Sequence, residues 1–332
     1  MTTEKLKYLF EKFKLTTPIT FKSILLALLL LFSSTSLSQN KIAITFDDLP
    51  CTNCKTLEDT KNVNKKLIET FKTYKLPAIG FINENKLYIN NQPDENKIDI
   101  LKEWLSNDLE LGNHTFSHIY INNSTIEQYK ADIIKGEIIT KQLTEEYGKI
   151  LKYFRHPQLR TGPTPEYKAQ LDKFLSDNNY TVAPVTMDND DYIYGYCYNK
   201  AKLNGDTATM NLIAKDYLSY MESIFMHFEK VSFDFLDYNL NQILLLHANE
   251  LNADYLPSLL NILKNKNYTF ISLDEALKDS AYQLPESSSE RGLSWLFRWQ
   301  LAKGQTYIPQ PDVTQKIHEL FLHYQKNPTK PD

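Results

Sequence analysis

Residues 44–50, ITFDDLP, place two adjacent carboxylates, Asp47 and Asp48, directly after a short apolar run. Two neighbouring negative charges repel each other, and neither can be buried without a partner. A polar turn after a strand is the simplest interpretation of an isolated Asp-Asp pair. A functional interpretation requires further polar residues, elsewhere in the chain, that could meet these two carboxylates.

Short apolar runs alternate with helical patterns along most of the chain. Strands are expected at residues 42–46, 78–82, 109–113, 151–155, 180–187, 243–247 and 268–272. Helices are expected at roughly 58–74, 95–108, 124–147, 165–178, 206–229 and 253–266. Several strands are continuously apolar, which is typical of a parallel sheet covered on both faces. The alternation predicts an α/β fold, a distorted (β/α) barrel of seven or eight strands. A capping box of Ser124 and Glu127 is expected to open the third helix.

The N-terminus has the pattern of an export signal. Five lysines precede an apolar run of nine residues, 24–32, and the small residues SSTSLS follow it. Nine apolar residues are too few to span a bilayer, which needs about 20. The pattern therefore predicts a signal peptide over residues 1–38, cleaved after Ser38, with an uncleaved anchor as the alternative. A secreted or periplasmic protein without stable membrane insertion is expected.

The tail is Ser-rich and then aromatic. We expect residues 286–332 to be a C-terminal extension packed on the main domain, residues 39–285, through Trp295, Phe297 and Trp299. Ligand binding by these rings is the alternative.

Composition limits the partners and the redox chemistry. The 332 residues carry a net charge of -4 without a basic block in the body of the chain, which disfavours nucleic acid as a partner. In an exported protein Cys51 and Cys54 could form a disulfide, with free thiols as the main alternative. A Cys-x-x-Cys without a second pair is a weak metal signal, and Cys197 is left over either way. The oligomeric state stays open.

Polar clusters follow five of the predicted strands. They are TFDD (45–48), HTFSH (114–118), RHP (155–157), DNDDY (188–192) and LLLH (244–247). The carboxyl ends of barrel strands open onto one face, where active sites form. These clusters should therefore converge in space.

A metal site is the most specific expectation from these residues. Asp48, His114 and His118 offer two imidazoles and one carboxylate, which leaves an open position on zinc, or on another divalent ion such as Co2+ or Ni2+. Adjacent strand residues point apart, so Asp47 should not be a second ligand and is free to act as a base.

The chain resembles the polysaccharide deacetylases, the carbohydrate esterases built on the NodB homology domain. The five clusters stand in the family's order, and the resemblance spans roughly residues 41–280. It implies a distorted barrel and removal of acetyl groups, with N-acetyl favoured over O-acetyl, from a glycan such as a chitooligosaccharide or peptidoglycan.

The resemblance also implies roles for individual residues. Asp47 would be the general base, oriented by Arg155, and His247 the general acid, held by Asp191. A backbone amide near Gln158 would help to stabilise the oxyanion.

The chain departs from the family pattern at the rim of the site. Leu49-Pro50 stands where Gly is usual, Gln158 where an aromatic residue is usual, and Tyr192 where Trp is common. These changes affect which substrate the site would bind more than which reaction it would catalyse. A hydrolase of small linear or cyclic amides is one alternative. A degenerate glycan-binding protein is another, although it would be expected to have lost a site residue, and none is lost. Asp188 is expected in a turn or a supporting role.

Overall fold

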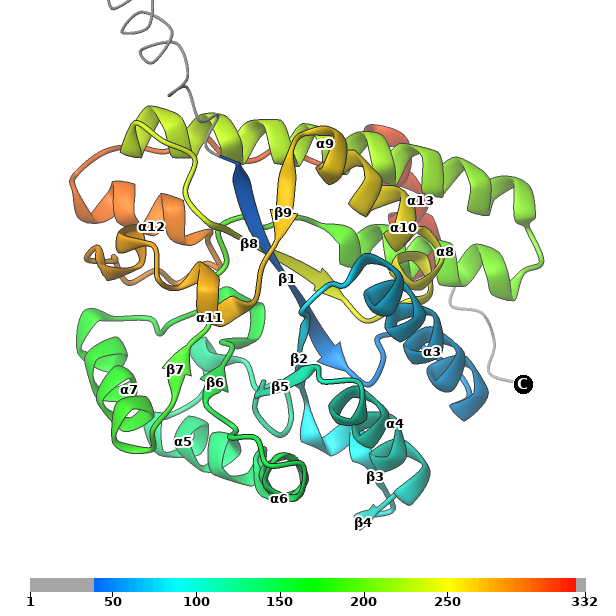
Figure 1. Cartoon of the computed structure of the whole chain (residues 1–332), viewed down its shortest axis with the longest axis horizontal. Helices are drawn as coiled ribbons and strands as arrows, with labels where there is room; N and C mark the ends of the chain where they lie inside the picture. Colours follow the sequence, from blue (N-terminus) through cyan, green and yellow to red (C-terminus); the bar gives the residue numbers. More distant parts are fainter. Residues whose placement is uncertain (1–38, 327–332) are drawn as a thin grey trace, which may run out of the picture. The chain divides into compact units, whose positions relative to one another are not determined.

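A seven-stranded parallel sheet forms the centre of the structure, a computed structural model that describes residues 39–326. The strand order is β7-β6-β5-β2-β1-β8, and β9 pairs with β1 (Figure 1). The predicted signal peptide lies outside the described residues. The strands are β1 (Asn40–Leu49), β2 (Ile79–Ile82), β5 (Glu110–Asn113), β6 (Tyr153–Phe154), β7 (Thr181–Val182), β8 (Gln242–His247) and β9 (Tyr268–Phe270), with a separate hairpin of β3 (Tyr88–Ile89) and β4 (Gln92–Pro93).

The residues that follow β7 contact β8, the strand at the opposite end of the sheet order. Met187 forms a parallel bridge with Leu244 of β8, and the backbone N of Thr186 donates to the carbonyl of Ile243 at 3.0 Å. This contact closes the sheet into a distorted barrel, so the predicted fold is confirmed. The predicted strand 180–187 is nevertheless interrupted, because Pro184 has no N–H for a ladder hydrogen bond.

Helices surround the sheet. They are α3 (Leu57–Tyr74), α4 (Glu95–Ser106), α5 (Ile126–Lys135), α6 (Ile138–Glu146), α7 (Pro165–Asp177), α8 (Asp191–Leu203), α9 (Thr207–Leu236), α10 (Glu250–Asn265), α11 (Leu273–Ala276), α12 (Trp295–Ala302) and α13 (Gln315–Lys326). Short 3₁₀ turns lie between these helices and strands at η1 (Glu84–Leu87), η2 (Ile121–Asn123), η3 (Pro157–Leu159) and η4 (Ser280–Gln283). Among residues 39–326, no helix is both long enough and apolar enough to cross a membrane.

The two-residue period of β1 separates a packing face from a chemical face. Phe46 faces outward, where its ring lies 5.3 Å from Phe71 of α3 and 6.3 Å from Trp104 of α4. Ala43 packs in an apolar cluster with residues of β2 and β8, and Asp47, two pleats further along the same face, pairs in register with His247. The polar residues therefore lie at the carboxyl end of the barrel interior.

The predicted helix over 124–147 is wrong, because α5 and α6 are separate helices that divide at Gly136. A Cβ at this position would lie 2.5 Å from the backbone N of Phe116. The carbonyl of Asp132 accepts from the same N–H at 3.0 Å, and its carboxylate accepts two hydrogen bonds from Ser117 at 2.9 Å. The break therefore gives room to the loop that carries the HTFSH motif and fixes it.

The expected capping box is displaced by one residue. Thr125 Oγ1 accepts from the backbone N of Gln128 at 3.2 Å, and Gln128 Oε1 accepts from the backbone N of Thr125 at 2.9 Å. Ser124 instead ends the preceding 3₁₀ turn, where its hydroxyl donates to the carbonyl of Tyr120. Two further helices differ from expectation: α8 was not predicted, and α9 extends to Leu236.

Helix α12 belongs to the apolar core. Trp295, Phe297 and Trp299 are at most 4% exposed, and the buried guanidinium of Arg298 donates to the carbonyl of Leu159 at 2.7 Å. The aromatic rings therefore pack in the core rather than facing a ligand.

We predict that Phe297→Ala lowers the free energy of unfolding by about 3–5 kcal/mol, since it opens a cavity in the core. Leu301→Ala, on the same helix and 36% exposed, should change it by only about 0.5 kcal/mol. Urea denaturation of both variants measures the difference. Equal stability of the two would show that α12 contributes little to the core.

Candidate active site

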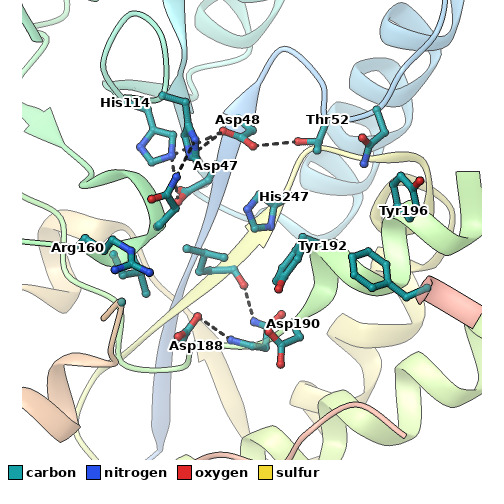
Figure 2. Close-up of a pocket in the computed structure, with 18 of the residues that line it drawn as sticks. Asp47, Asp48, Thr52, His114, Arg160, Asp188, Asp190, Tyr192, Tyr196 and His247 are labelled. Atoms are coloured by element: carbon teal, nitrogen blue, oxygen red, sulfur yellow. Dashed lines mark hydrogen bonds and ion pairs between the residues drawn. The ribbon is translucent and has the colours of Figure 1, made fainter. Parts of the chain in front are cut away.

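A cavity of about 620 Å³ opens at the carboxyl ends of the barrel strands. Asp47, Asp48, His114, His118 and His247 line it, and Figure 2 shows the labelled members of this group around one space. The predicted convergence of the strand-end clusters is therefore present. Two further predicted residues support the cavity from behind, as described below.

The two adjacent carboxylates do not point apart. Asp47 Oδ2 and Asp48 Oδ1 each lie 3.7 Å from Nε2 of His114. Asp48 has a positive φ of 67°, and the pairing of β1 with β2 shifts register between Phe46 and Leu49. This irregularity interrupts the strand alternation, so the premise that these two adjacent residues point apart is wrong, while the group of candidate ligand residues still leaves Asp47 out.

The hydrogen bonding of His114 fixes which ring nitrogen faces the carboxylates. Its Nδ1 lies 2.8 Å from the carbonyl of Arg155, which can only accept, so Nδ1 carries the proton. Burial holds the pKa of His114 well below its usual range, and burial also lowers the pKa of His118. The ring of His114 is therefore neutral, and the lone pair of Nε2 points at two negative groups.

A cation bound between these groups would make the arrangement favourable, because it would attract both the lone pair of His114 and the negative carboxylates. Asp48 Oδ1 lies 3.7 Å from Nε2 of both His114 and His118, and the candidate ligand atoms of the three residues all lie within 4.8 Å of one another. A separation of 3.7 Å is too long for a hydrogen bond but near that of two atoms about 2.1 Å from one ion. Asp48 Oδ1 is buried and has no hydrogen-bond partner among the described residues. The three residues fit a divalent cation.

Lys86 is a positive charge that the sequence did not reveal. Its Nζ lies 3.7 Å from Asp48 Oδ1 and donates to the carbonyl of Asp48 at 2.9 Å. Burial alone would raise the pKa of Asp48, but Lys86 and His118 together hold it well below its usual range. Asp48 is therefore ionised. The sequence feature that could have indicated this role is the position of Lys86 shortly after β2, at the same edge of the sheet as the other site residues.

Asp47 lies beside a fully buried arginine. Arg155 Nη1 is 3.4 Å from Asp47 Oδ1, and Arg155 Nη2 donates to Oγ1 of Thr45 at 3.0 Å. The guanidinium also lies 4.6 Å from the ring centre of Phe81. Burial raises the pKa of Asp47 to about 6 against the opposing charge of Arg155. Arg155 has no exposed area, so its pair with Asp47 is buried.

His247 forms a pair with Asp191 at the start of α8. Its Nδ1 lies 2.6 Å from Asp191 Oδ1, and the other carboxylate oxygen accepts from the backbone N of His247 and from Nδ2 of Asn252. Burial would lower the pKa of His247, but the Asp191 carboxylate outweighs it and raises the pKa to about 9. Asn252 lies on α10 and had no signal in the sequence.

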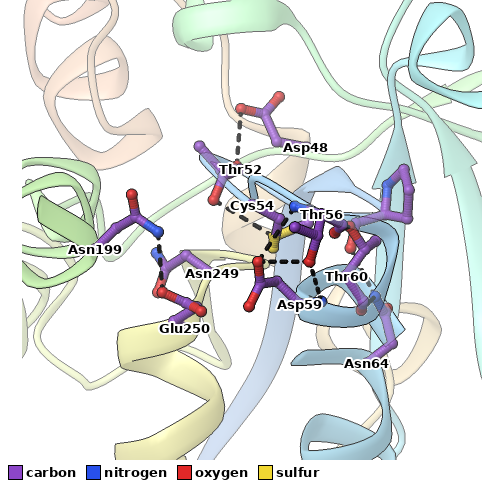
Figure 3. Close-up of a disulfide and its surroundings, with 12 residues drawn as sticks. Asp48, Thr52, Cys54, Thr56, Asp59, Thr60, Asn64, Asn199, Asn249 and Glu250 are labelled. Atoms are coloured by element: carbon purple, nitrogen blue, oxygen red, sulfur yellow. Dashed lines mark hydrogen bonds between the residues drawn. A yellow bond between two sulfur atoms is a disulfide. The ribbon is translucent and has the colours of Figure 1, made fainter. Parts of the chain in front are cut away.

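The Cys-x-x-Cys motif forms a disulfide at the rim of the cavity (Figure 3). Between the two cysteines, Thr52 donates from its backbone N to the carbonyl of Ala248 at 2.7 Å and from Oγ1 to Asp48 Oδ2 at 3.4 Å. The disulfide loop therefore adjoins a candidate metal ligand. Cys197 is free and buried.

Gln158 and Tyr192, two of the residues at which the chain departs from the family pattern, line the cavity, and so does Asp188. Gln158 has a positive φ of 53°, and its Nε2 lies 3.5 Å from Nδ1 of His118. The ring of Tyr192 is 6.3 Å from that of His247. Burial raises the pKa of Asp188 to about 7, and its carboxylate accepts from the backbone N of Asn189 at 2.9 Å.

The chain is similar in sequence to known proteins. Residues 34–183 match the polysaccharide deacetylase family model. A peptidoglycan-N-acetylglucosamine deacetylase of Bacillus cereus is 30% identical over 120 residues, which are 35% of this chain and 45% of that protein. The chain thus spans less than half of the length of this curated relative.

Two solved structures resemble the chain at low sequence identity. The chitin deacetylase of Colletotrichum lindemuthianum is 20% identical, with a TM-score of 0.48, over 73% of this chain and 89% of that one. A CE4 family pseudoenzyme from Bacillus anthracis is 12% identical, with a TM-score of 0.45, over 72% and 66%. Residues 34–183, which carry three of the five motifs, are thus similar to the polysaccharide deacetylase family.

Proposed function

We propose that the protein is a metal-dependent deacetylase that hydrolyses N-acetyl groups of a glycan. The observation that carries the proposal is the placement of two acid–base groups with opposite charge states beside the Asp48, His114 and His118 cluster. With a pKa of about 6, Asp47 is mostly ionised at pH 7, and with a pKa of about 9, His247 is mostly protonated. One group is ready to accept a proton and the other to donate one.

Asp48, His114 and His118 would hold the divalent ion, and zinc suits their nitrogen and oxygen donors. When bound, such an ion acts as a Lewis acid toward a carbonyl oxygen and makes a water easier to deprotonate. Arg155, through its carbonyl, keeps the lone pair of His114 directed at the cluster.

The chain's own acid–base groups then account for the proton transfers. Asp47 accepts a proton from the attacking water as the new C–O bond forms at the acetyl carbonyl. The C–N bond breaks, the electron pair goes to nitrogen, and His247 donates its proton there, which leaves acetate and a free amine. Arg155 holds the carboxylate of Asp47, and Asp191 holds the imidazole of His247.

Two observations support an N-acetylated glycan as the substrate class. The Bacillus cereus relative is named for that chemistry, and a protonated His247 is most useful for an amine, which leaves poorly as an anion. We also propose that the protein is exported and starts near Gln39. N-terminal sequencing of exported protein tests this, and material that still begins at Met1 would contradict cleavage.

Acetate release from a substrate panel tests the proposed activity. Incubation with acetylated chitooligosaccharides, peptidoglycan and acetylated xylan should release acetate, with a matching number of free amines from the first two. Release from xylan alone would assign the enzyme to O-acetyl groups. A protein that binds a glycan but releases no acetate would favour the glycan-binding alternative.

A further inference from the structure

Helix α13, far beyond the family match in the sequence, contributes side chains to the active-site cavity. Phe321 and Gln325 line the cavity together with Tyr192 and Tyr196 of α8. The Phe321 and Tyr196 rings lie 5.3 Å apart at an interplanar angle of 77°. In Figure 2 a pale red helix, in the colour of the C-terminal end, runs beside Tyr192 and Tyr196. The side of the cavity next to His247 is therefore aromatic.

The position of α13 is fixed by buried contacts on the same face that carries Phe321. Ile317 and Tyr324, seven residues apart, are buried, and the hydroxyl of Tyr196 donates to the carbonyl of Tyr324 at 3.4 Å. Just before the helix, the hydroxyl of Thr314 lies 3.1 and 3.2 Å from the two carboxylate oxygens of Asp216. Phe321 is thus held against Tyr196 by a docked helix rather than by a loose tail.

The aromatic residues form a row that leads away from the catalytic histidine. Tyr192 lies next to His247, Tyr196 is one helical turn further along α8, and Phe321 contacts Tyr196. One turn of α-helix advances about 5.4 Å, close to the width of a sugar ring. A ring that presents its acetamide to His247 would lie near Tyr192, and the next ring of the same glycan would lie against Tyr196 and Phe321.

The chemistry of this surface suits a pyranose ring. Phe321 is only partly buried, although its ring would gain from full removal from water. A pyranose has an apolar face of C–H groups and a polar edge, which match aromatic faces flanked by the Tyr196 hydroxyl and the exposed Gln325 amide.

We propose that Tyr196 and Phe321 form a subsite for a second sugar ring, so that α13 selects glycans of at least two rings. The inference rests on the proposed function for the chemical class of the ligand. The inference goes beyond the proposed function because it assigns a role in substrate specificity to α13, which lies outside residues 34–183 of the family match.

The test compares Phe321→Ala with Leu322→Ala, a matched control on the same helix whose side chain is exposed and does not line the cavity. The probe is N-acetylated chitotetraose. Steady-state kinetics of acetate release give KM and kcat for each protein, and calorimetry gives Kd. Loss of roughly 50 Å² of apolar contact should raise KM and Kd of Phe321→Ala about five- to tenfold. Leu322→Ala should match the parent, and Phe321→Trp should retain or improve the affinity.

The readouts separate the inference from the proposed function. Metal content and the urea midpoint of Phe321→Ala should equal those of the parent, which excludes a merely structural effect. Unchanged KM and Kd in Phe321→Ala, or an equal rise in Leu322→Ala, would overturn the subsite and leave the deacetylase intact. Tetrasaccharide binding that weakens in Phe321→Ala without any acetate release in the parent would support the subsite and contradict the proposed catalysis. A parent that neither binds nor hydrolyses the tetrasaccharide would overturn both.

Discussion

Asp47→Asn and His247→Asn are each expected to lower the rate of acetate release by about 10²–10⁴-fold, while each variant keeps the bound metal of the parent. The reason is that each substitution removes one proton transfer and none of the three candidate metal ligands. Steady-state kinetics and metal analysis of the same preparations measure both quantities. Asp254→Asn, which removes a carboxylate paired with Lys66 on the surface, is the matched control and should keep full activity.

The double variant distinguishes joint action from independent damage. Because Asp47 and His247 act in one reaction, the combined loss should be much smaller than the product of the two single losses. The effect of His247→Asn should also be smaller for an O-acetyl substrate, since an alkoxide leaves more easily than an amide anion. Full activity of His247→Asn on an amide substrate would contradict its assignment as the acid.

The second large effect is expected from the metal ligands. His114→Ala combined with His118→Ala should lose the bound divalent ion and, with it, measurable acetate release, because only the Asp48 carboxylate would remain. Elemental analysis of the purified protein and an activity assay measure the two losses together. His318→Ala, which removes an exposed imidazole on α13, serves as the control. If the double variant bound metal as tightly as the parent, the site would be elsewhere.

The barrel and the location of its site could be predicted because they follow from local pattern. Apolar runs of strand length, each followed by polar residues, place Asp48, His114 and His247 at strand ends whatever the details of packing. The partners of these residues could not be predicted in the same way. Lys86 reaches Asp48 from a 3₁₀ turn, and Asn252 reaches Asp191 from α10, through contacts that only the folded chain creates.

Backbone detail accounts for the errors. The rule that neighbouring strand residues point apart fails at Asp48 because its φ is positive, which the sequence does not display. The helix break at Gly136 likewise depends on a loop that packs against it. The contribution of Phe321 to the cavity had no sequence signal, because the helical pattern of α13 does not indicate which element it docks on.

Metal titration of demetallated protein is the most direct test of the central claim, that Asp48, His114 and His118 hold a divalent ion on which deacetylation depends. Protein stripped by a chelator should release no acetate from an N-acetylated oligosaccharide. The activity should rise in proportion to the zinc added and level off near one equivalent per chain. The activity of the His114→Ala, His118→Ala protein should not rise with added zinc. Full activity of the stripped protein, or equal recovery by the double variant, would contradict the claim.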